Sequence, residues 1–443
     1  MARPRRAARA RPLTERLMQL MKVLAILMRA LAACLRLLPL KPRVAFLSRQ
    51  SSKLSLDYRL LIDELRGRLG PDQIVVCLSE PETKNIFSFA VGTAKQLYYA
   101  CTSKVVVIDG YIPAVCIPKK DERTTVIQMW HALGAVKKFG YQCLDTPAGR
   151  SSESAQIARM HRNYDWVIAG GPGAVPAYAE AFDYPEERVL PLGLPRVDYL
   201  LDASPNSERR ANMRKAAETY PFLDEGKRIV LYAPTLRKGE GYDEDWLTEY
   251  VREVASAMCA DGDFGSAAEA AGDPQDAHNL QDADNPQDAG DPQGAGSAQG
   301  AHSPQSAGSS QSVGDLHVSG DPDTLLVVAG HPLNDKFDES LERDYPFVRL
   351  AKGVPTIDLL GFADLVVTDY SAVAFEAGLL GKPLRFYTPD IERYRSSPGL
   401  NIEPETIDQA FVDEYFAGVA EGADESKGPT RRIADLVEQE LKN

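Results

Sequence analysis

The sequence predicts an α/β protein made of two units in tandem, each with a parallel sheet. From Val44 onward, short runs rich in Val and Ile alternate with helical patterns, which is typical of repeated βα units. The runs are continuously apolar, as expected for strands covered on both faces. The 443 residues exceed one ordinary hydrophobic core, and a polar stretch at 203–226 separates two series of runs.

The first series predicts five strands and the second predicts four, at residues 44–48, 73–79, 104–109, 125–130 and 166–170, then 228–233, 325–330, 364–369 and 384–387. Intervening helices are predicted, for example, at 94–101, 174–182 and 373–380. Sheets of this kind bind ligands at the carboxyl ends of their strands. We therefore expect two domains, 43–205 and 206–443, with a cleft between them.

Residues 1–42 predict a basic amphipathic helix that associates with a membrane. Leu, Met, Ile and Ala dominate residues 13–39, and they favour a helix. Cations recur every six or seven residues and so form one stripe, made of Arg9, Arg16, Lys22, Arg29 and Arg36. No uncharged apolar run reaches the roughly 18–20 residues that spanning requires. The pattern favours a helix in the plane of the interface, with its stripe towards anionic headgroups; the alternative is a helix docked on its own catalytic domain.

Residues 262–323 predict a disordered insertion in the second unit. Gly, Ala, Asp, Gln, Ser and Pro dominate this segment, and Gln recurs every six residues from Gln275 to Gln311. A six-residue period can indicate a β-helix, but each turn of that coil needs an apolar residue inside, and only Ala is available. We expect disorder because the segment cannot bury enough apolar surface to offset the entropy of ordering.

Charge and cysteine usage narrow the class of protein. The formal charge is −13, although residues 1–43 hold eleven Lys or Arg and a single acid. An acidic body argues against nucleic-acid binding, whereas the basic tip alone suggests an anionic partner. The six cysteines form no Cys-x-x-Cys pair, so we expect buried reduced thiols in a cytosolic protein.

The segment 130–140, WHALGAVKKFG, directly follows a predicted strand and supplies a candidate general base. His131 at a strand end would face the cleft, and an ordinary histidine pKa of about 6.5 suits proton abstraction at neutral pH. Lys137 and Lys138 follow, and cations beside a base suit an anionic substrate. The alternative is an ordinary histidine at the end of a strand.

Two motifs suggest contacts with phosphate. The segment 193–198, GLPRVD, places Arg196 between the two units, where a guanidinium can grip phosphate; a turn held by an Arg–Asp pair is the alternative. In 368–376, TDYSAVAFE, a strand ends at Asp369 and Ser371 can cap the following helix, which turns free N–H groups towards the cleft. A plain capping serine is the alternative there.

Two further strand ends carry polar groups. The segment 231–238, LYAPTLRK, ends a buried strand at Thr235 and continues with two cations. In 330–332, GHP, a proline stops the strand and fixes the direction of His331.

In this order and spacing, the five segments resemble motifs of the CDP-glycerol glycerophosphotransferase family, which includes teichoic acid polymerases and primases. The resemblance covers about residues 44–395, apart from the insertion. Family members carry Trp-His-Gly or Trp-His-Ala followed by Lys, then Gly-x-Pro-Arg-x-Asp, Tyr-Ala-Pro-Thr-x-Arg, His-Pro and Thr-Asp-Tyr-Ser-Ser-x-x-Phe-Asp. This chain departs from them at Ala372, at Glu376, and at Ala329-Gly330, where many members have Arg before His-Pro.

The resemblance implies a GT-B fold, with a Rossmann-like acceptor domain at 43–205 and a Rossmann-like CDP-donor domain at 206–443. It implies that His131 is the base on the acceptor hydroxyl and that His331, a second catalytic residue, holds the CDP-alcohol together with Pro234, Thr235, Arg196 and Ser371. The residues expected to bind substrate are Trp130, Lys137, Lys138, Arg196, Pro234, Thr235, Arg237, Asp369 and Ser371. No acidic metal cluster occurs at the strand ends, so we expect no metal ligand and no cofactor.

The expected reaction moves glycerol phosphate, or a related alditol phosphate, from a CDP-alcohol to a hydroxyl of a lipid-linked cell-envelope polymer and releases CMP. We expect the protein at the cytoplasmic face of the cell membrane, bound peripherally to an anionic surface. Two alternatives remain, a GT-B glycosyltransferase that uses a nucleotide sugar and a catalytically degenerate binding protein of the same fold.

Overall fold

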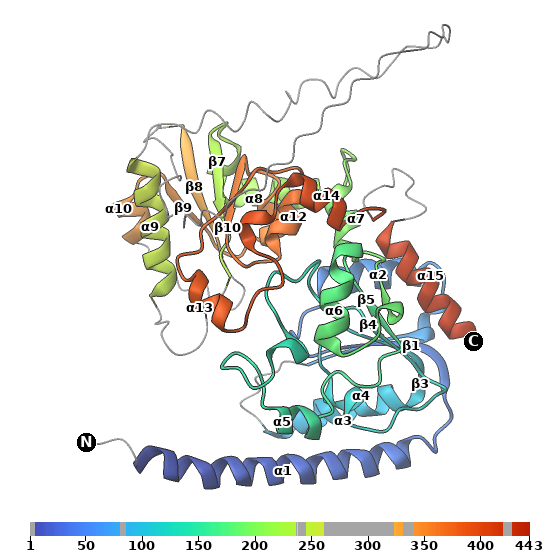
Figure 1. Cartoon of the computed structure of the whole chain (residues 1–443). Helices are drawn as coiled ribbons and strands as arrows, with labels where there is room; N and C mark the ends of the chain where they lie inside the picture. The colour runs from blue at the N-terminus through green and yellow to red at the C-terminus, as the bar shows by residue number, and fades with distance from the viewer. Residues whose placement is uncertain are drawn as a thin grey trace, which may run out of the picture.

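The computed structural model describes residues 5–79, 86–235, 237, 245–260, 323–330, 340–419 and 428–443. Two parallel sheets form two α/β domains, with helices packed around each sheet (Figure 1). A long helix, α1 (Arg5–Leu35), runs along one side of the first domain. The predicted fold class is confirmed.

The first domain holds a six-stranded sheet in the order β2-β1-β3-β4-β5-β6, and all of its neighbouring strands are parallel. Its strands are β1 (Lys41–Ser48), β2 (Ile74–Leu78), β3 (Ser103–Ile108), β4 (Thr125–Gln128), β5 (Trp166–Ile168) and β6 (Val189–Leu190). Its helices are α2 (Leu56–Arg66), α3 (Ile86–Thr102), α4 (Pro113–Cys116), α5 (Ser152–Ile157), α6 (Val175–Phe182) and α7 (Pro195–Leu201). The five predicted strands are present, and the two-residue β6 is an addition.

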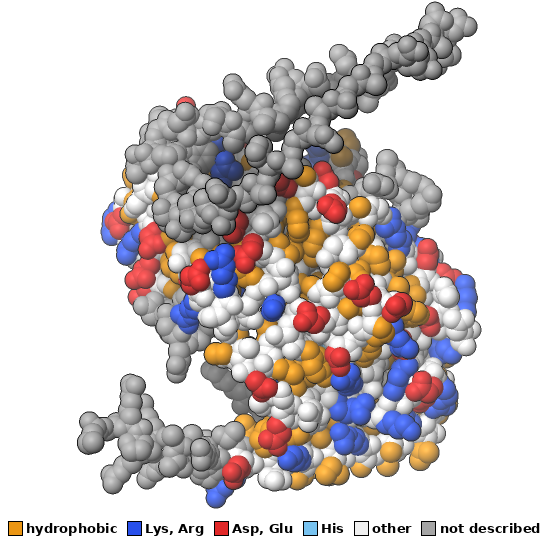
Figure 2. Space-filling model, in the orientation of Figure 1, with side chains coloured by type: hydrophobic (Ala, Val, Ile, Leu, Met, Phe, Trp, Pro, Cys, Tyr) orange, Lys and Arg blue, Asp and Glu red, His pale blue; other side chains and the backbone are white. Residues whose placement is uncertain are grey.

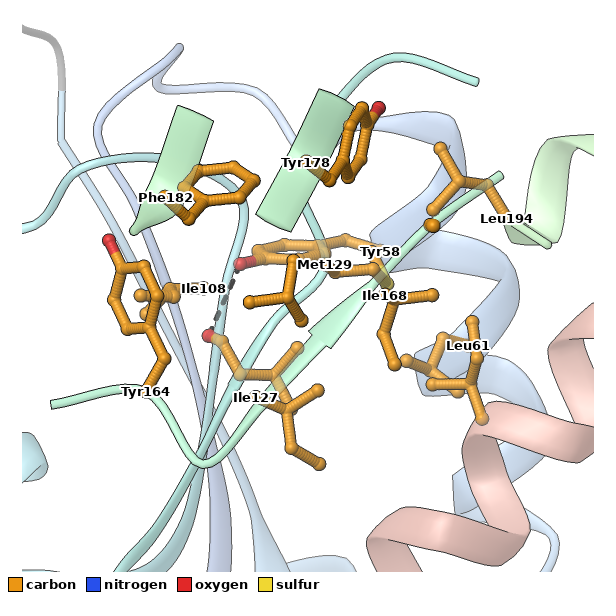
Figure 3. Packing of buried hydrophobic residues seen from close by; sticks show 14 of the residues in the cluster. Tyr58, Leu61, Ile108, Ile127, Met129, Tyr164, Ile168, Tyr178, Phe182 and Leu194 are labelled. Atoms are coloured by element: carbon orange, nitrogen blue, oxygen red, sulfur yellow. Dashed lines mark hydrogen bonds between the residues drawn. The ribbon is translucent and has the colours of Figure 1, made fainter. Parts of the chain in front are cut away.

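The core of this domain lies on both faces of the sheet, because β1 and β3 are buried almost throughout. Ser55 starts α2 by accepting the N–H of Tyr58 at 3.3 Å. The Tyr58 hydroxyl then donates to the carbonyls of Leu47 at 2.9 Å and Val107 at 3.2 Å, which ties α2 to two strands. Figure 3 shows its ring packed beside Met129.

The second domain holds a five-stranded parallel sheet in the order β11-β10-β7-β8-β9. Its strands are β7 (Arg228–Tyr232), β8 (Thr324–Ala329), β9 (Val348–Ala351), β10 (Leu365–Thr368) and β11 (Leu384–Phe386). The described helices of this part of the chain are α8 (Glu208–Thr219), α9 (Trp246–Ala260), α10 (Ser340–Asp344), α11 (Thr356–Leu359), α12 (Val373–Leu379), α13 (Ile391–Ser396) and α14 (Gln409–Tyr415). The four predicted strands are present, and β9 was not predicted.

The predicted insertion, 262–323, lies outside the described residues except for Asp323. It separates α9 from β8, which are consecutive described elements of the second domain. The disorder of this segment therefore stays a prediction from composition.

The last helix, α15 (Pro429–Lys442), returns to the first domain. It packs against α2, and its buried residues Ile433, Ala434 and Val437 belong to the core that contains β1 and β3. The expected boundary at 205/206 assigned all later residues to the second domain. The structure corrects this assignment for α15, because its apolar face is covered by the first domain.

Helix α1 packs along the first domain, where it contacts α3 and α5. Ala25 is 4% exposed and Ala32 is fully buried, because small side chains let the helix approach closely. By length and composition alone, Glu15–Leu35 is also apolar enough to cross a membrane, with a mean hydropathy of 1.7. The contacts match the alternative in which the helix docks on its own domain.

The structure corrects the expected direction of the cationic stripe. Three of its cations have partners on the first domain: Lys22 with Glu153 at 3.1 Å, Arg29 with the carbonyl of Ile117 at 3.2 Å, and Arg36 with the carbonyl of Lys119. Periodicity places these side chains on one face of the helix, but it does not say which face packs on the protein.

Candidate active site

Three neighbouring strands of the first sheet bring polar groups to one edge. β1, β3 and β4 are adjacent and parallel, so their carboxyl ends meet. Ser48 ends β1, Asp109 directly follows β3, and His131 follows β4 by three residues. The structure therefore places His131 where the sequence predicted, and it adds Asp109 as a neighbour.

The geometry of His131 leaves one ring nitrogen free to act as a base. Its Nδ1 lies 3.0 Å from the backbone oxygen of Asp109. A carbonyl oxygen only accepts hydrogen bonds, so Nδ1 carries the proton and Nε2 keeps its lone pair. The Gln50 side-chain nitrogen is farther from Nδ1, at 3.5 Å.

The surroundings of His131 keep it neutral at pH 7. The side chain is open to solvent at one side, but the protein around it desolvates the ring. This burial lowers the pKa of His131 below 6.5, and the positive charge of Arg196 lowers it further, while the Asp109 carbonyl and Asp57 oppose the change. A neutral imidazole with a free Nε2 is the form that accepts a proton.

Trp130 directs His131 through an unusual backbone. Its φ is +57°, a conformation that costs free energy in a bulky residue. The Gln128 side chain accepts the Trp130 N–H at 2.9 Å, and the indole stacks on Phe139 with centroids 5.0 Å apart. These contacts favour a positioning role for Trp130, with its ring 4.2 Å from that of His131.

Asp109 has a carboxyl group that is almost fully buried and incompletely paired. Its side chain is 3% exposed, and Oδ1 has no hydrogen-bond partner in the described part of the chain. Burial raises the pKa of Asp109 to about 7, although a hydrogen bond from Ser48 opposes the change. Asp109 was not among the predicted site residues, although an acid at the end of an apolar strand is a signal that the sequence contains.

Arg196 is held by two carboxylates and links the two domains. Its backbone N–H and Nε donate to Asp57 on α2 at 2.8 and 2.9 Å, and its Nη1 donates to Glu376 on α12 at 2.7 Å. Its Nη2 also donates to the His131 carbonyl at 3.2 Å. Burial alone would lower the pKa of Arg196, but Asp57 and Glu376 raise it, so the group stays charged. These contacts favour a role in positioning His131 and the two domains over direct binding of phosphate.

The edge of the second sheet is built around Asp369, which directly follows β10. Thr235, after β7, donates to it through its backbone N–H at 2.9 Å and its hydroxyl at 2.7 Å. Arg237 is fully buried and pairs with Asp369 and with Asp390, the latter at 3.2 Å. Arg237 also lies 5.3–5.5 Å from four aromatic rings, those of Trp246, Tyr250, Tyr370 and Tyr394. The buried guanidinium is placed to hold the strand ends together.

Lys137 and Lys138 lie where the two domains meet. Lys137 pairs with Leu400 in an isolated antiparallel bridge, and the Lys138 N–H donates to Gly399 at 3.0 Å. The Lys137 ammonium lies 5.9 Å from the Tyr394 ring. Burial lowers the pKa of Lys137, while the charge of Asp369 raises it, so Lys137 lies within electrostatic reach of the second-sheet edge.

Of the remaining predicted site residues, the structure describes Pro234 and Ser371 but not His331. Pro234 is half-buried between β7 and Thr235. The Ser371 hydroxyl accepts the N–H of Val373 at 3.3 Å, a bond that supports the start of α12. His331 lies outside the described residues. No group of three His, Cys, Asp or Glu side chains that could hold a metal occurs in the described part of the chain.

Comparison of the sequence with known proteins identifies the family of this chain. A family model described as CDP-Glycerol:Poly(glycerophosphate) glycerophosphotransferase matches residues 31–258 and 306–412. A teichoic acid ribitol-phosphate primase of Bacillus spizizenii is 30% identical over 81% of this chain and 76% of its own length. A teichoic acid glycerol-phosphate primase of the same organism is 25% identical over 69% of this chain and 61% of its own length.

Solved structures agree on the fold. The wall teichoic acid polymerase TagF aligns with a TM-score of 0.54 at 17% identity, over 97% of this chain and 98% of that chain. A variant of TagF soaked with CDPG aligns with a TM-score of 0.55, with the same identity and coverage. At this identity the likeness shows that the two chains share a fold.

Proposed function

This chain belongs to the CDP-glycerol:poly(glycerophosphate) glycerophosphotransferase family, and we propose that it transfers an alditol phosphate from a CDP-alditol to a hydroxyl of a lipid-linked envelope polymer or its primer. Both ribitol-phosphate and glycerol-phosphate enzymes are among its relatives. The observation that carries the proposal is His131, with Nδ1 bound to the Asp109 carbonyl and Nε2 free.

The proposed step is a direct displacement at phosphorus. Nε2 of His131 takes the proton from the acceptor hydroxyl, whose oxygen forms a bond to the β-phosphorus of the donor. The bond from that phosphorus to the bridging oxygen breaks, and CMP leaves with the bonding pair. Positioning and charge stabilisation supply most of the catalysis in such transfers. By resemblance, His331, Pro234, Thr235 and Ser371 are proposed to hold the donor.

The test is to incubate the purified full chain with CDP-glycerol and, separately, CDP-ribitol, together with a soluble primer analogue. We expect CMP release that depends on the acceptor and is faster with one of the two donors. Release of UDP from a nucleotide sugar, with no CMP from either donor, would show a glycosyltransferase instead. No turnover of any donor would indicate a binding protein.

We further propose that α1 attaches the enzyme to the membrane through its apolar outer face. Seven large apolar side chains on α1 are 47–61% exposed: Leu17, Leu20, Val23, Leu24, Ile26, Leu27 and Leu31. Hydrophobic side chains gather along the lower edge of the molecule, over this helix (Figure 2). An exposed row of this size is unusual for a soluble surface and suits the acyl boundary of a bilayer.

We expect binding of α1 to membranes to depend only weakly on salt concentration, because Lys22, Arg29 and Arg36 already have partners on the protein. Vesicle co-sedimentation should show binding that survives high salt and is lost in the double variant Leu24→Gln/Leu27→Gln. The matched control, Leu37→Gln/Leu38→Gln, changes exposed leucines beyond the end of the helix and should keep most of the binding. Equal pelleting of wild type and Leu24→Gln/Leu27→Gln would contradict the proposed anchor.

A further inference from the structure

Two arginines lie beside the edge that carries His131 and take no part in the contacts described above. Arg49 follows Ser48 at the end of β1, next to Gln50, whose side chain reaches the His131 ring. Arg150 comes from the loop before α5, and its guanidinium lies 5.3 Å from the centre of the Tyr111 ring. Tyr111 follows β3 by three residues and is fixed by a hydroxyl bond to the Ala158 carbonyl at 2.7 Å.

The two guanidinium groups lie close enough to influence each other. Burial lowers the pKa of Arg49, and the charge of Arg150 lowers it further. Burial raises the pKa of Tyr111, and the charges of both arginines oppose this rise, so both lie within electrostatic reach of Tyr111. Arg49 packs its cation over the Phe89 ring at 5.0 Å, which holds the side chain in place without neutralising it.

The pair also lacks counterions. Across the described ranges, neither Arg49 nor Arg150 has a carboxylate within 4.0 Å, whereas Arg196 and Arg237 each have two. Their guanidinium groups donate no hydrogen bond to any described residue either. Two neighbouring cations with unused, planar donors repel each other until an anion binds, and their forked geometry matches phosphate.

A hollow lies over the first turns of α5, the helix that begins two residues after Arg150. This hollow of about 310 Å³ is lined by residues that include Tyr141, Ser152, Ala155 and Arg159. It lies over α5, and α5 also contacts α1. The hollow therefore lies near the helix that we propose faces the membrane.

We propose that Arg49 and Arg150 form a binding site for a phosphoryl group of the acceptor. This assignment rests on the proposed function, because it requires an acceptor that carries phosphate near its reacting hydroxyl. The group is either a phosphodiester of the growing chain or the diphosphate that links the primer to its lipid. In both cases the anion holds the acceptor so that its terminal hydroxyl reaches Nε2 of His131.

The test compares the acceptor kinetics of Arg49→Gln and Arg150→Gln with wild type, using the full chain and three soluble acceptors. The first is a short poly(alditol phosphate) without lipid, the second a saccharide on a short-chain alkyl diphosphate, and the third the same saccharide as a phosphate-free glycoside. Arg343→Gln, an exposed arginine of the second domain paired with its neighbour Asp344, is the matched control.

Each variant should raise the acceptor KM roughly tenfold, the effect of about 1.4 kcal/mol from a lost charge-assisted hydrogen bond. The KM for the CDP-alditol should stay unchanged, as should all constants of Arg343→Gln. The acceptor that shows the rise identifies the source of the phosphoryl group. With the glycoside, wild type and variants should behave alike, and Arg150→Lys should recover part of the loss because it restores the charge.

The outcomes separate this site from the proposed function. If wild type releases no CMP from either donor, the proposed function fails. If wild type is active but both Gln variants keep the wild-type KM for the phosphorylated acceptors, the proposed function stands and the anion site is wrong. A rise in the donor KM alone would assign the pair to the donor and would also overturn the proposal.

Discussion

The two sheet edges that meet in this protein are built from similar residue types, yet they leave their charges in opposite conditions. At the second-sheet edge, Arg237 and Asp369 are fully buried and paired with each other, and Thr235 adds two further bonds. At the first-sheet edge, Asp109 keeps an unpaired oxygen and His131 a free nitrogen. The second-sheet edge, in which Arg237, Asp369 and Thr235 are fully paired with one another, therefore has a structural role, and we call it the frame. Catalytic groups, in contrast, need hydrogen-bonding capacity that the protein itself does not use.

The largest expected effect is on the frame. Replacing Arg237 with Ala would leave Asp369 buried without its charge partner, which typically costs roughly 3–5 kcal/mol. Chemical denaturation should show this loss, and Arg343→Ala on the exposed surface should show little change. A stable Arg237→Ala protein with weakened donor binding would reverse the assignment and make Arg237 a substrate contact.

The unpaired carboxyl of Asp109 should destabilise the native state at high pH. Because the native pKa is raised from 3.8 to about 7, the native state holds a proton that the unfolded state has lost between these values. Stability should therefore fall as pH rises through this window, by up to ~4 kcal/mol above pH 7. Asp109→Asn should remove this decline and be more stable than wild type at pH 8.

The matched comparison for Asp109 is Asp57, which is equally buried but paired with Arg196. Asp57→Asn should destabilise the protein, because it leaves Arg196 with a missing partner. If denaturation at pH 8 showed the two Asn variants changing stability in the same direction, the distinction between a paired and an unpaired edge would be lost.

A smaller effect concerns the pH dependence of the rate. Burial and Arg196 lower the pKa of His131 below 6.5, so kcat/KM should stay level down to pH 6.5 and fall only at lower pH. Arg196→Gln removes the second cause and should move this acid limb to higher pH. An acid limb well above pH 6.5 in wild type would exclude His131, in this environment, as the base.

The smallest effect is expected from the insertion next to the second edge. Deleting residues 265–320 shortens a segment that composition predicts to be disordered, and the lower entropy cost of closing a shorter loop favours the folded state by at most about 2 kcal/mol, so no loss of stability is expected. Melting temperature and CMP release should both stay near wild type. A large fall in melting temperature would show that the frame of the second domain extends into this segment.

The sequence predicted the strands and helices better than it predicted which surfaces of them pack together. Nine strands were recognisable because each is a run of apolar residues covered on both faces. The four-residue β9 was missed because Val348–Ala351 contains Arg349 and lacks that uniformity. The direction of the α1 stripe was wrong because a helical period is the same whichever face packs on the protein.

The site residues could likewise be predicted only where the signal is local in the sequence. His131 could be predicted because the end of a parallel strand is a local property of the sequence. The pairing of Arg196 with Asp57 and Glu376 joins residues 139 and 180 positions apart, so only the folded chain reveals that this arginine is already occupied. Arg237 and Arg49 look alike in the sequence, and burial between two carboxylates separates them.

The most direct test of the account is CMP release by His131→Ala measured beside wild type, with both proteins checked by denaturation. Loss of the free Nε2 should lower turnover of the CDP-alditol by at least ~10²-fold, as is typical of lost general-base catalysis, with little change in stability. His331→Ala should instead weaken use of the donor. Near-wild-type turnover by a folded His131→Ala protein would contradict the proposal that the first-sheet edge carries the chemistry.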